Sequence, residues 1–322
     1  LIEIIPKDTE SEPEVTYNKA KQLKELGVRI VIGPVFNKNL DRLEDLDDMI
    51  FLSLTNKIID NPKNIISTGI NAGSQLNTIS KFQRNNDLKK TILLVPSKSY
   101  KVEIQKAIKS SKIKTFKVHY YDSDPTKLTK QIEKITKYSQ RKQNVLDEIE
   151  RLKNSDDPNK DRKIKILEKR DTIGKIGFDS VIIADFDQSL KSLITSLIYT
   201  DVLPLNTYFI TLNQWFDESL LKETSYQPIY YPSVNKKNYD EFIKLYFEKF
   251  NHYPNQLSFL SYDLVGLVYY LIFQNNWNLD DKIFLKKNKF KGKIGIFEIK
   301  DKKINHILNF YKIENSNIKK IF

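Results

Sequence analysis

The sequence has 322 residues, a length that predicts two domains or one large one. Hydrophobic residues make up 40% of the chain and aromatic residues 11%, which excludes global disorder. The chain has no cysteine, so disulfides, thiolate metal sites and cysteine nucleophiles are excluded, and its three histidines lie far apart in sequence.

The formal net charge of +12 has two interpretations, a solvated surface or a polyanion-binding face. We favour the interpretation as a solvated surface, because the lysines are mixed with acidic residues and do not cluster with aromatic residues as they do in a nucleic-acid groove. The one dense basic run, Lys286–Lys293, is expected to be a loop. The longest apolar stretch, Leu257–Phe273, contains Asp263 and falls short of the ~20 residues of a membrane span, so it predicts a buried helix.

The first part of the chain alternates strand and helix patterns. Strands are expected at Leu1–Ile5, Val28–Ile32, Met49–Ser53, Thr91–Val95 and Lys112–Tyr121. Helices are expected at Glu14–Leu26, Asn39–Leu46, Ser74–Phe82 and Tyr100–Ser110. Repeated strand–helix units with apolar strands predict a doubly wound parallel sheet.

The middle of the chain interrupts this rhythm. Pro125–Lys153 has one long helical pattern, a polar turn follows at Asn154–Asn159, and Asp161–Lys169 is helical again. Together, residues 125–170 predict a charged helical hairpin inserted into the fold. It is either a solvated surface insertion or an arm that docks on a partner.

Strand and helix patterns then resume. Strands are expected at Phe178–Ala184, Thr207–Leu212, Pro228–Tyr231, Lys293–Ile299 and Asn305–Ile313. Helices are expected at Gln188–Tyr199, Asp217–Lys222, Asn238–Phe250 and Leu257–Phe273. The pattern predicts two doubly wound, Rossmann-like α/β lobes, the first from residues 1–116 and 255–290 and the second from residues 117–254 and 291–322.

Recognisable catalytic motifs are missing from the sequence. It has no G-x-G-x-x-G or G-x-x-x-x-G-K-[ST] loop, no H-E-x-x-H and no G-x-S-x-G. We therefore expect no catalytic residue, no metal, no cofactor and no enzymatic activity.

Polar and aromatic residues recur directly after the apolar strands. In open α/β sheets, ligands bind outside the carboxyl ends of the strands, so these side chains are expected to line one cleft between the lobes. Hydroxyls, amides and rings suit a small polar ligand. The candidate ligand-binding residues are Ser53, Thr55, Asn56, Asn71, Tyr100, Asp185, Phe186, Asn213, Gln214, Trp215 and Tyr231.

Several segments resemble the type I periplasmic-binding fold of leucine/isoleucine/valine-binding proteins. Gly27–Phe36 is similar to the fold's GV-x-x-IIGP strand and turn. Leu52–Asn56 resembles the strand end where such proteins place Ser or Thr against a ligand carboxylate, and Ser261–Asp263 resembles their a-YDA helix. The resemblance implies that Ser53 and Thr55 hold an anionic group and that the lobes close on a ligand.

A narrower resemblance is to bacterial lipoproteins called penicillin-binding protein activators. It rests on Lys137–Lys142, Leu167–Asp179, Asn213–Asp217 and Gly292–Phe297, although Asn213 replaces the usual glycine. The first strand and helix of the family, a signal peptide and a lipid-bearing cysteine are missing from this chain, and a trimmed N-terminus would explain all three.

Two functions follow from these resemblances. The first is a non-enzymatic extracytoplasmic binding protein for an amino acid or related polar ligand, which would work with an ABC permease. The alternative is an envelope lipoprotein that docks on and activates a peptidoglycan synthase. Both imply a location in the periplasm or cell envelope, no nucleic-acid partner, and membrane attachment only through a lipid anchor that this chain lacks.

Overall fold

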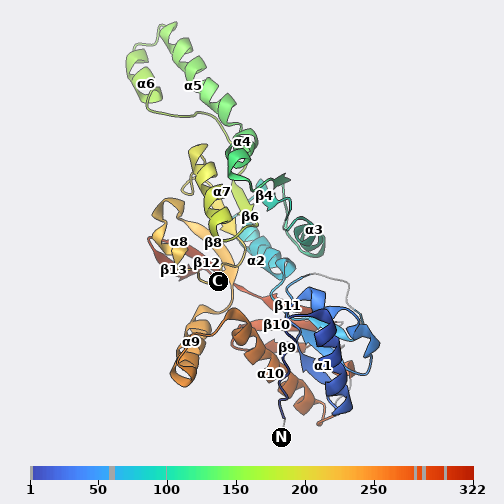
Figure 1. Cartoon of the computed structure of the whole chain (residues 1–322). Coiled ribbons are helices and arrows are strands. Elements are labelled where there is room, and N and C mark those ends of the chain that lie inside the picture. The colour runs from blue at the N-terminus through green and yellow to red at the C-terminus, as the bar shows by residue number, and fades with distance from the viewer. Residues whose placement is uncertain (1–2, 58–61, 99, 279–280, 285–287, 301–302) are drawn as a thin grey trace. The chain divides into compact units, whose positions relative to one another are not determined.

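The computed structural model describes residues 3–57, 62–98, 100–278, 281–284, 288–300 and 303–322. The chain forms two compact units, each built from three segments. Unit 1 contains Leu1–Thr78, Gln105–Lys112 and Pro232–Asn309, and unit 2 contains Ile79–Ile104, Ile113–Tyr231 and Phe310–Phe322. Figure 1 shows the elements of both units along the chain.

Unit 2 is built on a seven-stranded sheet in the order β13-β12-β8-β7-β6-β4-β5. The five strands from β8 to β5 run parallel, whereas β12 and β13 pair antiparallel. β4 and β6 are fully buried apolar strands, as expected of strands covered on both faces. The bounds are β4 (Thr91–Pro96), β5 (Lys117–Tyr121), β6 (Ser180–Ile183), β7 (Tyr208–Thr211), β8 (Ile229–Ser233), β12 (Asn309–Glu314) and β13 (Asn317–Lys320).

The helices of unit 2 connect these strands. α4 (Pro125–Thr136) begins with Asp124, whose side chain accepts a hydrogen bond from the Thr126 amide. α7 (Asp187–Tyr199) lies beside α4, with a hydrogen bond between the Thr129 and Ser196 hydroxyls. The remaining elements are α8 (Ser219–Lys222), the 3₁₀ turn η3 (Thr224–Tyr226), and α2 (Ala72–Asn85) and α3 (Lys101–Ser110), which each cross from one unit to the other.

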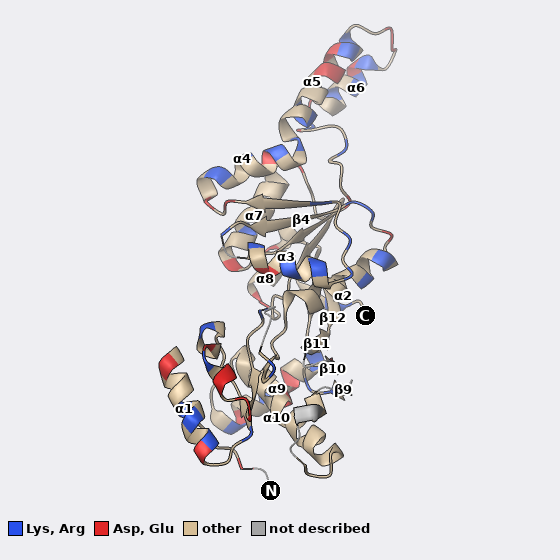
Figure 2. Ribbon diagram, turned by 90° about the vertical axis from the view of Figure 1, so that its right-hand side faces the viewer, with Lys and Arg blue, Asp and Glu red and all other residues tan. Residues whose placement is uncertain are grey.

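A helical arm extends from unit 2, formed by α5 (Tyr138–Lys153) and α6 (Lys160–Leu167). Both Lys or Arg positions and Asp or Glu positions occur along its ribbon (Figure 2). Arg141 anchors its base: the buried guanidinium donates to the Thr200 carbonyl, the Thr172 hydroxyl and the Asp201 carbonyl.

Unit 1 contains two three-stranded sheets. One is parallel, in the order β1-β2-β3, and the other is antiparallel, in the order β11-β10-β9. Tyr17, Leu43 and Phe51 belong to the core cluster against the parallel sheet. The strands are β1 (Ile30–Ile32), β2 (Ile50–Ser53), β3 (Ile65–Ser67), β9 (Asn288–Lys291), β10 (Ile296–Lys300) and β11 (Lys303–Ile307).

Three long helices belong to unit 1: α1 (Pro13–Glu25), α9 (Lys236–Phe250) and α10 (Gln256–Gln274). Asn235 and Asn255 cap the starts of α9 and α10. α10 is long and apolar enough to cross a membrane, but one such helix is weak evidence for a membrane span. It buries a row of residues in unit 1 that includes Phe259 and Leu267. Shorter 3₁₀ turns are η1 (Asn37–Leu40), η2 (Leu43–Asp45) and η4 (Asp281–Phe284).

The α/β class and the parallel sheet are confirmed, but several expected elements differ. Residues 3–5 form no strand, and Ile4 is 70% exposed; residues 1–2 lie outside the described part. The expected helix Pro125–Lys153 is two helices, because Lys137 takes a left-handed conformation (φ 55°) between them. α4 therefore packs on the body of unit 2, and only α5 and α6 form the hairpin.

The edges of the sheets also differ from the expectation. The basic run contains strand β9, whereas Lys286 and Lys287 lie outside the described residues. β4 pairs with both β5 and β6, so Thr91–Pro96 belongs to the sheet of unit 2 and not, as expected from its place in the sequence, to the first lobe.

Candidate functional site

The carboxyl edge of the unit 2 sheet gathers most of the expected site residues. β5, β4, β6, β7 and β8 are neighbours and parallel, so their carboxyl ends lie along one edge. This edge of an open α/β sheet is the usual position of a ligand site.

A buried tyrosine–carboxylate pair lies at the centre of this edge. The Tyr121 hydroxyl, at the end of β5, donates a 2.5 Å hydrogen bond to Asp185 Oδ2, just after β6. Asp185 Oδ1 accepts from the Phe186 amide at 2.9 Å. Burial raises the pKa of the Asp185 carboxyl above its usual value, and the like charge of Asp187 adds to the rise. The site therefore holds a buried carboxylate, Asp185, that the negative charge of Asp187 repels.

Two aromatic rings flank this acidic position. The rings of Tyr100 and Phe186 meet edge to face, with centroids 5.6 Å apart. Burial and the charges of Asp185 and Asp187 raise the pKa of the Tyr100 hydroxyl. Tyr100 is 36% exposed, so the aromatic side of this corner is open to solvent, whereas Asp185 is only 6% exposed.

The residues after β7 form a tight turn beside the same edge. Asn213 Oδ1 accepts from the Trp215 amide at 2.9 Å. Gln214 Nε2 donates to the carbonyls of Leu212 and Asp185, which ties the β7 end to the β6 end. Trp215 has a positive φ of 48° and is partly exposed.

The expected site residues of unit 1 lie at the carboxyl edge of its parallel sheet. Ser53 is fully buried and donates its hydroxyl proton to the Pro34 carbonyl at 2.9 Å. Thr55 Oγ1 accepts from the Lys57 amide. Asn71 accepts from the Ser74 amide at the start of α2, and Asn56 is exposed.

Close backbone approach shapes this edge of unit 1. A Cβ on Gly69 would lie 2.6 Å from the carbonyl oxygens of Leu54 and Thr55, so only glycine lets the chain after β3 pass so near the chain after β2. His306, on β11, is buried, and Nε2 lies 2.8 Å from the Thr68 carbonyl. Desolvation lowers the pKa of His306 to about 4, so its ring is neutral near pH 7.

One expected site residue and one missed residue stand out. Tyr231 lies inside β8, is fully buried beside the Phe216 and Tyr311 rings, and belongs to the core. Tyr121 was not among the candidates, although it ends a strand at the same edge as Asp185. No group of three or more His, Asp or Glu that could hold a metal occurs in the described part of the chain.

No protein-family model matches the sequence, and no curated protein sequence matches it either. Solved structures do match. The LpoA (YraM) C-domain from Haemophilus influenzae, a regulator of PBP1A, has a TM-score of 0.63 and 14% identity over 98% of this chain and 88% of that one. The chain spans 52% of full-length LpoA.

Amino-acid-binding proteins match as well. An ABC transporter substrate-binding protein from Desulfitobacterium hafniense, in complex with Leu, has a TM-score of 0.61 and 10% identity over 98% of this chain and 88% of that one. LivJ from Streptococcus pneumoniae, in complex with isoleucine, has a TM-score of 0.56 and 15% identity over 98% and 85%. The chain therefore has the type I periplasmic-binding-protein fold, as its sequence motifs predicted.

Proposed function

We propose that this protein is a non-catalytic, extracytoplasmic binding protein that holds a small polar ligand with an ammonium group at the carboxyl edge of the unit 2 sheet. The observation that carries the proposal is Asp185, a buried carboxylate with a raised pKa beside Asp187 and two aromatic rings. The likeness to amino-acid-binding proteins supports the ligand class and the location.

An ammonium group is the ligand chemistry that this corner favours. A carboxylate that is desolvated next to a like charge gains most from an opposite charge. The faces of Tyr100 and Phe186 add attraction for a cation, worth about 0.5–2 kcal/mol for each well-placed ring. The amides of Asn213 and Gln214 and the indole of Trp215 are proposed to orient the rest of the ligand.

The carboxyl edge of the parallel sheet in unit 1 is proposed, by itself, to bind an anionic group. Thr55 is the better donor there, because its oxygen accepts from the Lys57 amide and, among the described residues, its hydroxyl proton has no acceptor. Ser53 already donates its proton to Pro34, so it would have to release that bond first. Asn56 and Asn71 complete the proposed set on this unit.

Calorimetric titration tests the first proposal. Free amino acids, their N-acetyl forms and simple amines are compared, and we expect binding by the free amino acids but not by the N-acetyl forms, which lack the charge. Asp185→Asn should abolish this binding, whereas Asp87→Asn, which changes an exposed acid of unit 2 that is paired with Lys89, should not. Equal binding of N-acetyl forms, or full binding by Asp185→Asn, contradicts the proposal.

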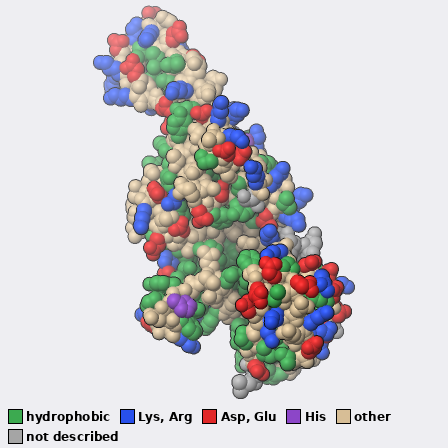
Figure 3. All heavy atoms as spheres, in the orientation of Figure 1, with side chains coloured by type: hydrophobic (Ala, Val, Ile, Leu, Met, Phe, Trp, Pro, Cys, Tyr) green, Lys and Arg blue, Asp and Glu red, His purple; other side chains and the backbone are tan. Residues whose placement is uncertain are grey.

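A second candidate function is docking on a peptidoglycan synthase through the helical arm. The arm exposes Leu146 on α5 (57%) and Ile166 on α6 (48%) among its charges, and hydrophobic and charged side chains mingle on its surface (Figure 3). Apolar anchors within a polar rim are typical of protein interfaces. The likeness to the LpoA C-domain, a regulator of PBP1A, supports this partner class.

The double substitution of Leu146 and Ile166 by Asp tests this docking. Pull-down with a peptidoglycan synthase from the same cell should be lost, while amino-acid binding at unit 2 should be retained. Leu205→Asp is the control, since Leu205 is 82% exposed on the body of the same unit. Docking that survives the double substitution excludes the arm as the contact.

A further inference from the structure

A cavity of about 500 Å³ lies at the opposite edge of the unit 2 sheet. Lys90, Asp179 and Thr207 line it, and each directly precedes one of the parallel strands β4, β6 and β7. The cavity is therefore at the amino edge of the sheet, away from Asp185, where the helical arm joins the body. Its volume falls in the range of small-molecule sites, roughly 300–1,000 Å³.

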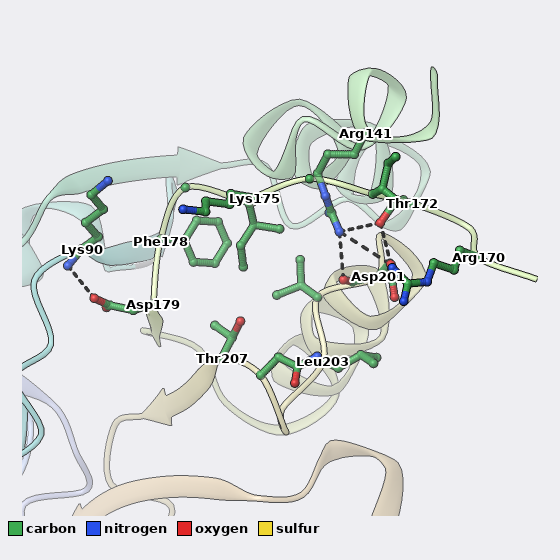
Figure 4. A pocket seen from close by; sticks show the side chains of 16 residues that line it. Lys90, Arg141, Arg170, Thr172, Lys175, Phe178, Asp179, Asp201, Leu203 and Thr207 are labelled. Atoms are coloured by element: carbon green, nitrogen blue, oxygen red, sulfur yellow. Dashed lines mark hydrogen bonds and ion pairs between the residues drawn. The ribbon is translucent and has the colours of Figure 1, made fainter. Parts of the chain in front are cut away.

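Four cationic side chains line this cavity against two acids. Figure 4 shows Lys90 and Lys175 on one side and Arg141 and Arg170 on the other, with Thr207 between the two sides. Within the described part of the chain, Lys90, Arg170 and Lys175 form no ion pair, and all three are exposed. The cavity thus has two separate cationic sides, and cations outnumber acids in its lining.

The two acids are already engaged by protein groups. Asp179 Oδ2 accepts from the amides of Lys89 and Lys90, both at 2.9 Å. Asp201 Oδ2 accepts from the Thr172 hydroxyl at 2.5 Å and lies 3.6 Å from the Arg141 guanidinium. Both carboxylates on the wall of the cavity are therefore already bound by protein groups, and the cationic side chains that line it are in excess.

Two buried polar atoms on the wall lack a hydrogen-bond partner among the described residues. One is Nε of Arg141, a residue that is only 5% exposed, and the other is Oγ1 of Thr207, which is 3% exposed. A buried donor left without a partner costs about 1–3 kcal/mol. Such groups persist where a ligand supplies the missing partner.

We infer that this cavity is a second ligand site of the protein, for a small molecule with two separated anionic groups, carboxylate or phosphate. One group lies between Lys90 and Lys175, and the other accepts from Arg141 Nε–H and Arg170. The Thr207 hydroxyl donates to the ligand between them. Charge-assisted bonds of this kind are the stronger class of protein hydrogen bond.

The test titrates the full chain with adipate, inorganic pyrophosphate and acetate at low ionic strength. We expect adipate or pyrophosphate to bind at least about tenfold more tightly than acetate. Their second anionic group makes a further charge-assisted hydrogen bond, which adds to the binding free energy. Adipate and pyrophosphate distinguish carboxylate from phosphate ligands. Equal, weak binding of all three anions would overturn the inference.

Variants assign the binding to this cavity. Arg170→Ala and Lys175→Ala should each weaken dianion binding by about tenfold. Lys165→Ala is the matched control, because Lys165 is exposed on α6 and does not line the cavity. Thr207→Val should weaken binding without unfolding the protein. Dianion binding that is unchanged in Arg170→Ala and Lys175→Ala, or equally reduced in Lys165→Ala, would refute the site.

Discussion

The Tyr121 hydroxyl donates to the Asp185 carboxylate at 2.5 Å, and the two residues lie at the ends of β5 and β6, the parallel strands on either side of β4. The bond compensates part of the cost of burying the carboxylate. Tyr121→Phe should therefore destabilise the protein by about 1.5–3 kcal/mol near neutral pH, the range for a hydrogen bond to a charged group.

Tyr231→Phe is the control for this prediction. Tyr231 is equally buried in the same unit, but its hydroxyl has no hydrogen-bond partner among the described residues. Removing that hydroxyl should leave the urea midpoint unchanged or slightly raised. A similar loss of stability in both variants would show that ring packing, and not the Asp185 bond, is responsible.

Asp185 and His306 should give stability profiles of opposite slope. The pKa of Asp185 is raised in the folded state, so the folded protein binds this proton more tightly than the unfolded chain. The contribution of Asp185 to stability therefore falls as pH rises from the unfolded value of 3.8 to the raised folded value. Asp185→Asn should remove this fall, as measured by urea unfolding across that range.

His306 acts in the other direction. Its pKa is lowered from 6.5 to about 4, so between these values the unfolded chain binds the extra proton. Stability should drop as pH falls through this window, by up to about 3 kcal/mol from this residue. His306→Gln keeps a donor for the Thr68 carbonyl and should flatten the drop. If the stability of His306→Gln falls with pH as much as that of the original protein, other groups cause the drop.

Gly292 should tolerate no side chain. The Asp263 carboxylate on α10 accepts from the amides of Lys293 and Ile294, both at 2.7 Å, and a Cβ on Gly292 would overlap that carboxylate. Gly292→Ala should cost about 1–3 kcal/mol, as overpacking commonly does. Gly266→Ala is the control, since its Cβ would meet the Phe290 ring at an ordinary 3.5 Å. Equal thermal midpoints for the two variants would contradict the overlap.

Thr207→Val should raise stability in the absence of ligand. The Thr207 hydroxyl is buried without a described partner, and a methyl group in its place removes that penalty, about 1 kcal/mol. Thr211→Val, at the other end of β7, is the matched control: its hydroxyl donates to the Leu212 carbonyl, so this variant should lose stability. Chemical denaturation of both variants measures the difference, and a loss in Thr207→Val would show that the hydroxyl has a partner.

The sequence predicted the buried strands well because their runs are continuous and mostly apolar, as in Thr91–Pro96 and Ser180–Ile183. It missed β3, since three residues within a polar stretch carry too little pattern. It also missed the break at Lys137, which has no glycine, proline or asparagine to mark it. Strand order was beyond reach, because β4 could be assigned to either unit until its pairing with β6 was known.

The candidate site was predicted in part. Strand-end reasoning grouped Asp185, Phe186 and the Asn213–Trp215 turn, and the structure places them at one edge of one sheet; that they bind a ligand stays a prediction. It could not tell that Tyr231 points into the core, because that depends on the register of β8. Arg141 was overlooked, although it shares a helical stripe with Tyr138, Val145 and Leu152, and a charged residue within a buried stripe is a signal of a built polar contact.

The order of segments in unit 2 has a consequence for how the protein is made. β12 and β13 complete the sheet beside β8, yet they follow all of unit 1 in the chain. The Phe310 ring packs on Phe82 and Tyr230, which are synthesised long before it. A growing chain therefore holds the edge of β8 and these aromatic rings uncovered while the last segment of unit 1, Pro232–Asn309, is being synthesised, and in that interval a chaperone has an open strand edge to protect.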